Sequence, residues 1–226
     1  MKFGFSLGML IAIAVSFESP VHAQQSHDSK NGLVCANPTG KKAPAGVRFI
    51  NCNDGSLVDT TTGLMWELKD TTCATGDLHC VNNSYAWTSS GTQRDGTLYT
   101  VFLAGLNTDT VPESTNGTGS PGGPACFANH CDWRIPNIAE LQTIIDTNQA
   151  TAPGCVVGVA NGHPCIDVAA FDPPGYGTLD SLYWSDSLYG THGVEYTAWG
   201  VYFQTAYASL APVSVPAQAR AVRGGQ

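Results

Sequence analysis

Eight cysteines constrain the fold of this chain more than any other feature of its sequence. They are Cys35, Cys52, Cys73, Cys80, Cys126, Cys131, Cys155 and Cys165. An even number of cysteines in an exported chain indicates a disulfide framework, although eight cysteines allow 105 pairings. Short separations along the chain favour Cys73–Cys80, Cys126–Cys131 and Cys155–Cys165, each closing a short loop, and this choice leaves Cys35 to pair with Cys52.

The first residues have the pattern of a secretory signal peptide. Met1 and Lys2 give a positive start, an apolar run extends from Phe3 to Phe17, and residues 21–23 (VHA) fit a small-x-small cleavage site. The run is about 15 residues long, too short to span a bilayer comfortably. We therefore expect residues 1–23 to be removed on export, with an uncleaved signal anchor as the alternative. No later segment is apolar enough to cross a membrane, so membrane insertion is not expected.

The composition of the remaining chain excludes some classes of partner. The formal net charge is −8 and only 12% of residues are charged, which disfavours binding to nucleic acid or to an anionic membrane surface. Residues 24–46 are polar and read as a flexible lead-in. Residues 47–226 are long enough for one domain with a substantial core. We expect this domain to be secreted, to the periplasm or to the extracellular surface.

The start of the domain reads as paired strands. In residues 47–68, Asn53-Asp54-Gly55 and Thr62-Gly63 supply two turns, and Leu64, Met65 and Trp66 then enter the core. The same region is rich in side-chain oxygens and leaves calcium binding possible. It lacks the twelve-residue calcium loop that ends in Glu, so plain turns are the favoured interpretation and no cofactor is predicted.

Two helices are expected further along. Residues 98–107 form a plausible short helix, and the Gly- and Pro-rich residues 108–125 form a surface loop. A second helix follows Pro136, because Asn137 and Glu140 have the spacing of a capping box. Its apolar side chains fall on one face at helical spacing, and Asn148 is a reasonable end. These side chains are Ile138, Leu141, Ile144 and Ile145.

The last third of the chain indicates antiparallel strands at residues 181–190, 195–205 and 219–225. In the middle one, Trp199, Val201 and Phe203 alternate with Ala198, Gly200, Tyr202 and Gln204. Period two places the first set toward the core and the second set on the other face. Tyr196 has the same parity as Tyr202, so we expect these two tyrosines to share that outer face. Trp184 is expected in the core with Trp199.

Five motifs in this order resemble the Lcl C-terminal domain family, which is named after a bacterial collagen-like adhesin. They are DGSLVDTTTGLMWE (54–67), DWRIPNIAELQTIID (132–146), YWSDS (183–187), AWGVYF (198–203) and VRGGQ (222–226). The resemblance covers about residues 47–226. It implies an α+β, C-type lectin-like fold in which two short helices pack on small twisted antiparallel sheets with long, disulfide-stapled loops. It also implies that the chain ends bring the first and last strands together, as in domains of bacterial adhesins and related surface proteins.

Two departures from the family pattern bear on structure and ligand. Members often have a cysteine in the first helix and another in the closing motif, where this chain has FLAGLN (102–107) and Ala221. That bridge is expected to be absent. The adhesin that gives the family its name is associated with sulfated glycosaminoglycans, but a net charge of −8 argues against a polyanionic ligand here.

Metal and catalytic sites are the weaker interpretations. His79-Cys80 and His130-Cys131-Asp132 contain metal-ligand types, but they lack a CxxC pair, and export favours disulfides. Asp186, His192 and Glu195 contain the groups of a carboxylate–histidine catalytic site, but no hydrolase, metalloprotease or phosphate-loop motif accompanies them. Arg134 is expected to brace the helix start through a carboxylate or backbone carbonyls. We therefore predict no metal site and no enzyme activity.

The tyrosines near the C-terminus are the strongest indication of function. A tyrosine offers apolar area and a hydroxyl at low entropic cost, which suits sugars and peptides alike. We predict a ligand-binding domain, adhesin- or lectin-like, for a glycan or a surface protein. The expected contact residues are Tyr189, His192, Glu195, Tyr196, Tyr202, Gln204 and Tyr207. The alternatives are a structural subunit of a surface fibre or homo-oligomer, and an enzyme of the formylglycine-generating type that uses a reactive cysteine pair.

Overall fold

The computed structural model describes residue 35 and residues 46–108, 126–160, 162–192 and 195–224. These residues belong to one compact unit, Asn31–Gln226. The expected signal peptide, nearly all of the lead-in and most of the 108–125 loop lie outside the described residues. Within the described part, no helix has the length and apolar character needed to cross a membrane.

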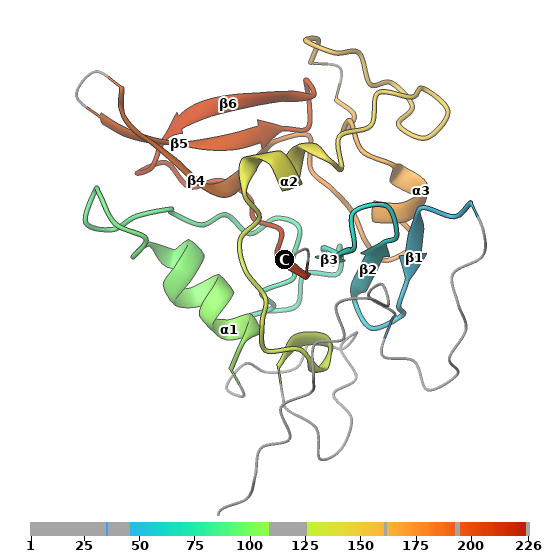
Figure 1. Cartoon of the computed structure of the whole chain (residues 1–226), viewed down its shortest axis with the longest axis horizontal. Coiled ribbons are helices and arrows are strands. Elements are labelled where there is room, and N and C mark those ends of the chain that lie inside the picture. The colour runs from blue at the N-terminus through green and yellow to red at the C-terminus, as the bar shows by residue number, and fades with distance from the viewer. Residues whose placement is uncertain (1–34, 36–45, 109–125, 161, 193–194, 225–226) are drawn as a thin grey trace, which may run out of the picture. The chain divides into compact units, whose positions relative to one another are not determined.

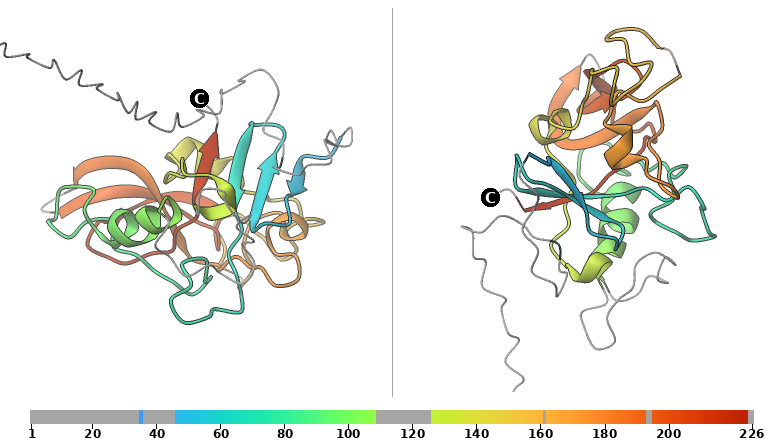
Figure 2. Two further views of the ribbon diagram at one scale, coloured as in Figure 1. Left: turned by 90° about the horizontal axis from the view of Figure 1, so that it is seen from below. Right: turned by 90° about the vertical axis from the view of Figure 1, so that its right-hand side faces the viewer.

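The first sheet joins the expected hairpins to the end of the chain. Its strands are β1 (Phe49–Asn51), β2 (Ser56–Asp59), β3 (Leu64–Glu67) and β7 (Val222–Gly224), and its antiparallel order is β1-β2-β3-β7. The turns have positive φ at Asn53, Gly55 and Gly63, as predicted. Figure 2 shows the last strand beside those of the first hairpin. The closing motif therefore completes the sheet that the N-terminal part of the domain begins.

A second antiparallel sheet contains β4 (Leu182–His192), β5 (Glu195–Tyr202) and β6 (Tyr207–Pro212) in that order (Figure 1). The sequence predicts β4 and β5 but not β6. That strand is short and ends in a proline, and it is held in place by its pairing with β5, in which Tyr207 lies opposite Tyr202. Residues 219–225, read as a strand of this region, contribute β7 to the other sheet instead.

A bulge in β4 positions polar side chains outside the sheet. The register shifts between Trp184 and Leu188, where the hydroxyl of Ser185 donates to the carbonyl of Trp199. The displaced residues reach the start of the second helix: the Asp186 N–H donates to the Pro136 carbonyl (2.8 Å), and the Ile138 N–H donates to the Ser187 hydroxyl (3.0 Å). Bulges commonly redirect side chains in this way.

The helices are shorter and more numerous than expected. The helix expected at 98–107 is confirmed: it starts as a π-helical segment, η1 (Leu98–Leu103), and ends as α1 (Ala104–Leu106). The second expected helix is α2 (Ile138–Gln142), with the predicted Asn137–Glu140 capping box. The short elements η2 (Phe127–Asn129) and α3 (Val168–Phe171) were not predicted.

The prediction that the second helix continues to Asn148 is wrong. The Thr143 hydroxyl bonds to the carbonyl of Glu140, and Ile145 leaves the helix to pair with Ile166. The Asp146 side chain then accepts from the N–H of Asn148. Such local side-chain bonds compete with helical ones and end the helix after five residues. The expected apolar face persists, because Leu141 and Ile144 are buried and Ile138 and Ile145 pack beside them.

Two large apolar clusters lie on opposite faces of the three-stranded sheet, and a third, small cluster is made of Ala152, Cys155 and Cys165. On one face, Trp184, Ala198 and Ala211 pack with Leu98 and Phe102 of the η1 helix. On the other face, Tyr183, Val201 and Phe203 pack with residues of α2 and of the first sheet. The central part of β4 and β5 is therefore buried on both faces, unlike the one-sided sheet that the alternation in sequence predicts.

Trp199 is only half-buried, which corrects its predicted place in the core. It lies on β5 toward the β4–β5 hairpin, outside both apolar clusters. The exposed ring of Tyr189 meets it edge to face, with the ring centroids 6.0 Å apart. The core aromatic of this region is instead Trp184, which is fully buried and donates its indole N–H to the carbonyl of Tyr85.

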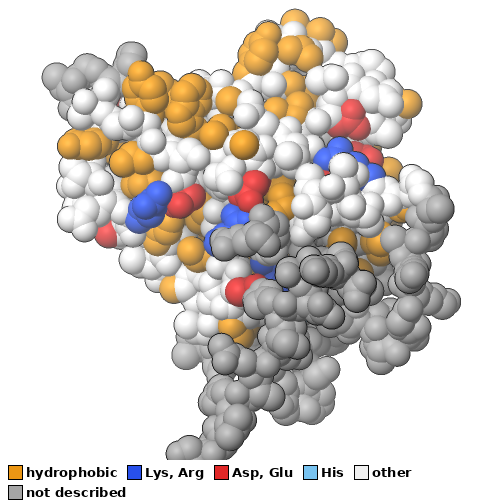
Figure 3. All heavy atoms as spheres, in the orientation of Figure 1, with side chains coloured by type: hydrophobic (Ala, Val, Ile, Leu, Met, Phe, Trp, Pro, Cys, Tyr) orange, Lys and Arg blue, Asp and Glu red, His pale blue; other side chains and the backbone are white. Residues whose placement is uncertain are grey.

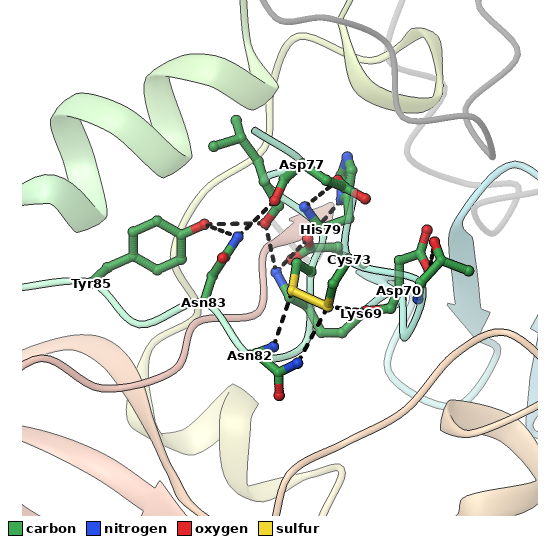
Figure 4. The surroundings of a disulfide bond; sticks show 12 residues. Lys69, Asp70, Cys73, Asp77, His79, Asn82, Asn83 and Tyr85 are labelled. Atoms are coloured by element: carbon green, nitrogen blue, oxygen red, sulfur yellow. Dashed lines mark hydrogen bonds and ion pairs between the residues drawn. A yellow bond between two sulfur atoms is a disulfide. The ribbon is translucent and has the colours of Figure 1, made fainter. Parts of the chain in front are cut away.

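All eight cysteines are paired: Cys35–Cys52, Cys73–Cys80, Cys126–Cys131 and Cys155–Cys165. Three of them are the pairs that short separation favours, and Cys35–Cys52 is the pair that this choice leaves over; no cysteine takes part in a bridge to the closing motif. Figure 4 shows Cys73 and its partner beside Asn82, His79 and Lys69. The Asn82 amide donates to the Cys73 sulfur at 3.4 Å. The Cys73–Cys80 bridge thus closes a short loop beside the buried Lys69.

Candidate binding surface and cleft

The exposed apolar side chains of the described residues concentrate on the three-stranded sheet and one loop bonded to it. Among the described residues, eleven large apolar side chains are exposed, and eight of them belong to this sheet and loop. Because isolated exposed apolar residues are ordinary but clusters mark contact sites, the concentration identifies this region as the candidate binding surface. The eight are Val156, Val157, Val159, Leu188, Tyr189, Tyr196, Tyr202 and Tyr207.

The predicted contact residues divide between the two ends of the sheet. Tyr196 and Tyr202 are both exposed, but six residues of a strand separate them by about 20 Å. Between them, Ala198 and Gly200 are buried, and a Cβ on Gly200 would lie 2.7 Å from the Leu182 side chain. The idea that the two tyrosines share one continuous outer face is therefore wrong, since the core covers the middle of that face.

At the hairpin end lie Tyr189, Tyr196 and Glu195, all exposed. His192 pairs with Glu195 where β4 and β5 meet, but its side chain lies outside the described part. Asp186 does not join them. Its carboxylate pairs with Arg94 at 2.6 Å and accepts from the Tyr99 hydroxyl at 2.7 Å.

At the other end, Tyr202 and Tyr207 face each other across β5 and β6, and the half-buried Gln204 lies in the turn between them. Next to Tyr207 is a tight turn of valines, in which the Val159 N–H donates to the Val156 carbonyl (2.9 Å). We call Val156, Val157, Val159, Tyr202 and Tyr207 the turn-end surface. Figure 3 shows apolar side chains gathered where Figure 1 places this loop and the start of β6.

The valine turn is fixed firmly to the sheet. Its Gly158 N–H donates to the Thr205 carbonyl (2.9 Å), and the Cys165 N–H donates to the Phe203 carbonyl (2.6 Å). The Cys155–Cys165 disulfide closes the loop that carries the turn. Gly158 has φ of 78° and lies so close to Tyr207 that a Cβ there would be 3.2 Å from its ring. The valines are therefore held exposed by an ordered loop.

Sequence reasoning missed the three valines. The run VVGV (156–159) is too short to predict a strand, and nothing in it shows that it will contact β6. The available signal was an apolar run inside a short disulfide loop rich in glycine. Such a loop has little room to bury side chains of its own, so the valines had to meet either the sheet or solvent.

A separate cleft of about 560 Å³ opens between the η1 helix, the start of α2 and the β4 bulge. Arg134 lines this cleft and, as predicted, braces the helix start: its guanidinium donates to both Glu140 carboxylate oxygens (2.7 and 2.6 Å) and to the Gly224 carbonyl (2.9 Å). Nothing in the sequence indicates that Arg94, Tyr99 and Asp186 join it there. The cleft is lined by Arg94, Tyr99, Leu103, Arg134, Ile135, Asn137, Glu140 and Asp186.

Several of the residues considered as metal ligands have other roles. His79 bonds through Nδ1 to Glu67 (2.7 Å), and Cys80 and Cys131 are in disulfides. Asp54 accepts from the backbone and hydroxyl of Ser56 within the first turn. Among the residues the structure describes, no group of three or more His, Cys, Asp or Glu side chains is placed to hold a metal ion.

The formylglycine-type alternative needs a reactive cysteine. Since the eight cysteines of the sequence form four disulfides, the folded chain has no thiolate to offer that chemistry.

Comparison with known protein families identifies this chain's family. The family model of the Lcl C-terminal domain matches residues 55–223. These residues include the three-stranded sheet, the valine turn and the cleft. No curated protein and no solved structure gives a significant match.

Proposed function

This chain belongs to the Lcl C-terminal domain family, and on that premise we propose that it is an exported, non-catalytic domain that binds a macromolecular ligand at a cell surface. Export is supported by the four disulfides, which form and persist in oxidising compartments. It is also supported by the signal-peptide pattern of residues 1–23.

The scaffold that we propose is C-type lectin-like. Its support is the meeting of the last strand, β7, with β3 near the start of the domain. Further support comes from the short helices beside two small antiparallel sheets, and from the disulfides that close the loops. Such a scaffold displays side chains from ordered loops, which limits the entropy lost on binding.

The observation that carries the proposal is the turn-end surface. Tyr207 is 54% exposed, and Val156 and Val159 are each 50% exposed, although a disulfide and backbone hydrogen bonds hold the loop in place. Ordered apolar side chains kept in water are typical of contact sites. Aliphatic valines beside tyrosines suit apolar protein side chains better than sugar hydroxyls, so we propose a protein ligand for this surface.

A binding array of purified surface and extracellular-matrix proteins, with immobilised glycans on the same array, tests the proposal. The folded chain is applied with and without calcium, beside the variant Tyr202→Ala/Tyr207→Ala. We expect the chain to be captured by at least one protein and the variant to be captured at least tenfold less. Equal capture of the two proteins by every positive spot would contradict a role for this surface.

Self-association is a second candidate, because the same exposed valines and tyrosines suit a second copy of the chain. It would make the domain a subunit of a fibre or multimer. Light scattering across a hundredfold range of concentration distinguishes the two, since only self-association raises the mass with concentration. A constant monomer mass would leave an external ligand as the occupant of the turn-end surface.

A further inference from the structure

The cleft beside α2 is built from three segments far apart in the sequence that bond to one another. Arg94 lies before η1, Tyr99 lies within it, Arg134 and Glu140 flank the start of α2, and Asp186 lies in the β4 bulge. The bonds from Asp186 to Pro136 and from Ile138 to Ser187 hold the bulge against the helix start. The polar groups of the cleft are therefore fixed before any ligand arrives.

The charges of the cleft cancel. Arg94 pairs with Asp186 (2.6 Å), and Arg134 pairs with Glu140 (2.6 Å). Burial raises the pKa of Glu140, but the hydrogen bonds from Arg134 and from the Asn137 backbone outweigh it and lower the pKa below its ordinary value. Burial and the hydrogen bond to Asp186 both raise the pKa of Tyr99, which therefore stays protonated and donates. Figure 3 shows acidic and basic side chains lying next to one another across this face.

Several hydrogen-bonding positions in the cleft are unused by the described residues. Asp186 receives Arg94 and Tyr99 on Oδ1, which leaves Oδ2 as an acceptor. Arg94 donates through Nε and Nη2, which leaves Nη1 as a donor. Asn137 uses its side-chain oxygen in the capping box, which leaves its amide NH₂. The Arg94 side chain is 54% exposed and that of Asp186 is 36% exposed, so solvent reaches these groups.

The remaining lining is apolar. Leu103, Ile135 and the ring of Tyr99 form part of the wall beside the two ion pairs. An apolar wall with a few fixed donors and acceptors is the usual composition of a small-ligand site, and the volume of about 560 Å³ lies in the usual range.

We propose that this cleft binds a neutral sugar residue. A sugar hydroxyl donates and accepts at once, so neighbouring hydroxyls can use the free Asp186 oxygen and the free Arg94 nitrogen together. The C–H face of the ring packs on the apolar wall. A sulfate or phosphate meets two carboxylates, and a cation meets two guanidinium groups, so the balance of charge favours an uncharged ligand over either.

The inference goes beyond the proposed function, because the cleft shares no residue with the turn-end surface. Protein capture at that surface and sugar binding in the cleft are measured separately, so either one can fail alone.

Saturation-transfer NMR on the folded chain tests the inference. The probes are lactose, maltose, cellobiose and chitobiose, beside a sulfated heparin disaccharide at the same concentration. We expect saturation transfer to at least one neutral disaccharide and weaker transfer to the sulfated one. The inference is overturned if none of the neutral probes binds, or if the sulfated probe binds more tightly.

Variants then place the binding site. Asp186→Ala and Arg94→Gln, each checked for an intact fold by its NMR spectrum, should each weaken binding of the neutral sugar at least tenfold. Val215→Ala, at an exposed position outside the cleft, should leave it unchanged. Asp186→Asn with Glu140→Gln makes the cleft positive and keeps a side chain suited to the capping box. This double variant should bind the sulfated probe more tightly than the neutral sugar, which reverses the preference of the unmodified chain. Neutral-sugar binding that survives both Asp186→Ala and Arg94→Gln would contradict the assignment.

Discussion

The ammonium group of Lys69 donates a 2.8 Å hydrogen bond to the carboxylate of Glu67, and both side chains are buried. The same carboxylate bonds to His79 Nδ1 (2.7 Å) and accepts the N–H of Ala221 (2.9 Å). Burial alone would raise the pKa of Glu67, but Lys69 and His79 outweigh it and lower the pKa to about 2. This carboxylate thus connects β3 to the segment before β7 and closes the domain.

Glu67 is expected to make the stability of the domain sensitive to acid. Its pKa is about 2 in the folded chain and about 4.3 in an unfolded one. The ionised carboxylate therefore makes its full contribution to the free energy of unfolding above about pH 4.5. About 3 kcal/mol of this free energy is lost as the pH falls toward 2. Glu67→Gln should be less stable at pH 7, because it leaves Lys69 buried without its partner, and its stability should change less over that range. Urea unfolding at several pH values measures both. If the unmodified chain and Glu67→Gln lose the same free energy of unfolding as the pH falls, Glu67 is not the group responsible for the acid sensitivity.

Replacing aromatic residues at two depths should separate the core from the surface. Trp184 is fully buried and bonded to Tyr85, so Trp184→Ala should lower the free energy of unfolding by about 3–5 kcal/mol. Tyr207 is more than half exposed, so Tyr207→Ala should change it by less than about 0.5 kcal/mol. Chemical denaturation of the purified proteins measures both values. A large loss in Tyr207→Ala would mean that the ring supports the sheet instead of a ligand.

The Cys155–Cys165 disulfide should matter for the turn-end surface as well as for stability. It spans ten residues, and replacing both cysteines by serine should cost about 2–3 kcal/mol. Because the same loop presents the valines, ligand capture should fall several-fold at a temperature where the protein stays folded. The matched control is Cys126→Ser/Cys131→Ser, which removes a local bridge beside η2. Equal effects of the two double variants on capture would argue against a specific role for the valine loop.

Two glycines give a test of the contact between the valine turn and Tyr207. Gly158 and Gly162 have nearly equal positive φ, 78° and 77°, but a Cβ at Gly158 meets the Tyr207 ring at 3.2 Å whereas one at Gly162 meets nothing within 4 Å. Both alanine variants should lose about 1 kcal/mol of stability from backbone strain. Only Gly158→Ala should also displace Tyr207 and weaken capture. Surface plasmon resonance with the array-identified ligand provides the measurement, and equal capture by the two variants would count against the contact.

The features predicted correctly from sequence depend on neighbouring residues. Three disulfides follow from short separations and the fourth is the pair left over, the Asn137–Glu140 capping box follows from a spacing of three, and the first turns follow from Asn53 and Gly55. Each of these features depends on residues that lie close together in the sequence, so the local sequence pattern is enough to predict it.

The features missed depend on contacts between distant segments. β6 is held by pairing with β5, and Trp199 is half-exposed because the two clusters that cover the sheet stop short of it. The cleft joins Arg94 to Asp186 across 92 residues. For the candidate surface, tyrosines were identified by type and parity, but parity does not reveal that the core covers the middle of the face. The valines were missed because their exposure depends on where the disulfide loop packs.

The most direct test of the central claim is the capture of the folded chain by its protein ligand, compared with that of Tyr202→Ala/Tyr207→Ala. The circular dichroism spectra and melting temperatures of the two proteins are matched first. If the turn-end surface binds the ligand, capture should fall at least tenfold while the melting temperature stays within about 2 °C. Undiminished capture by the well-folded variant would contradict the account.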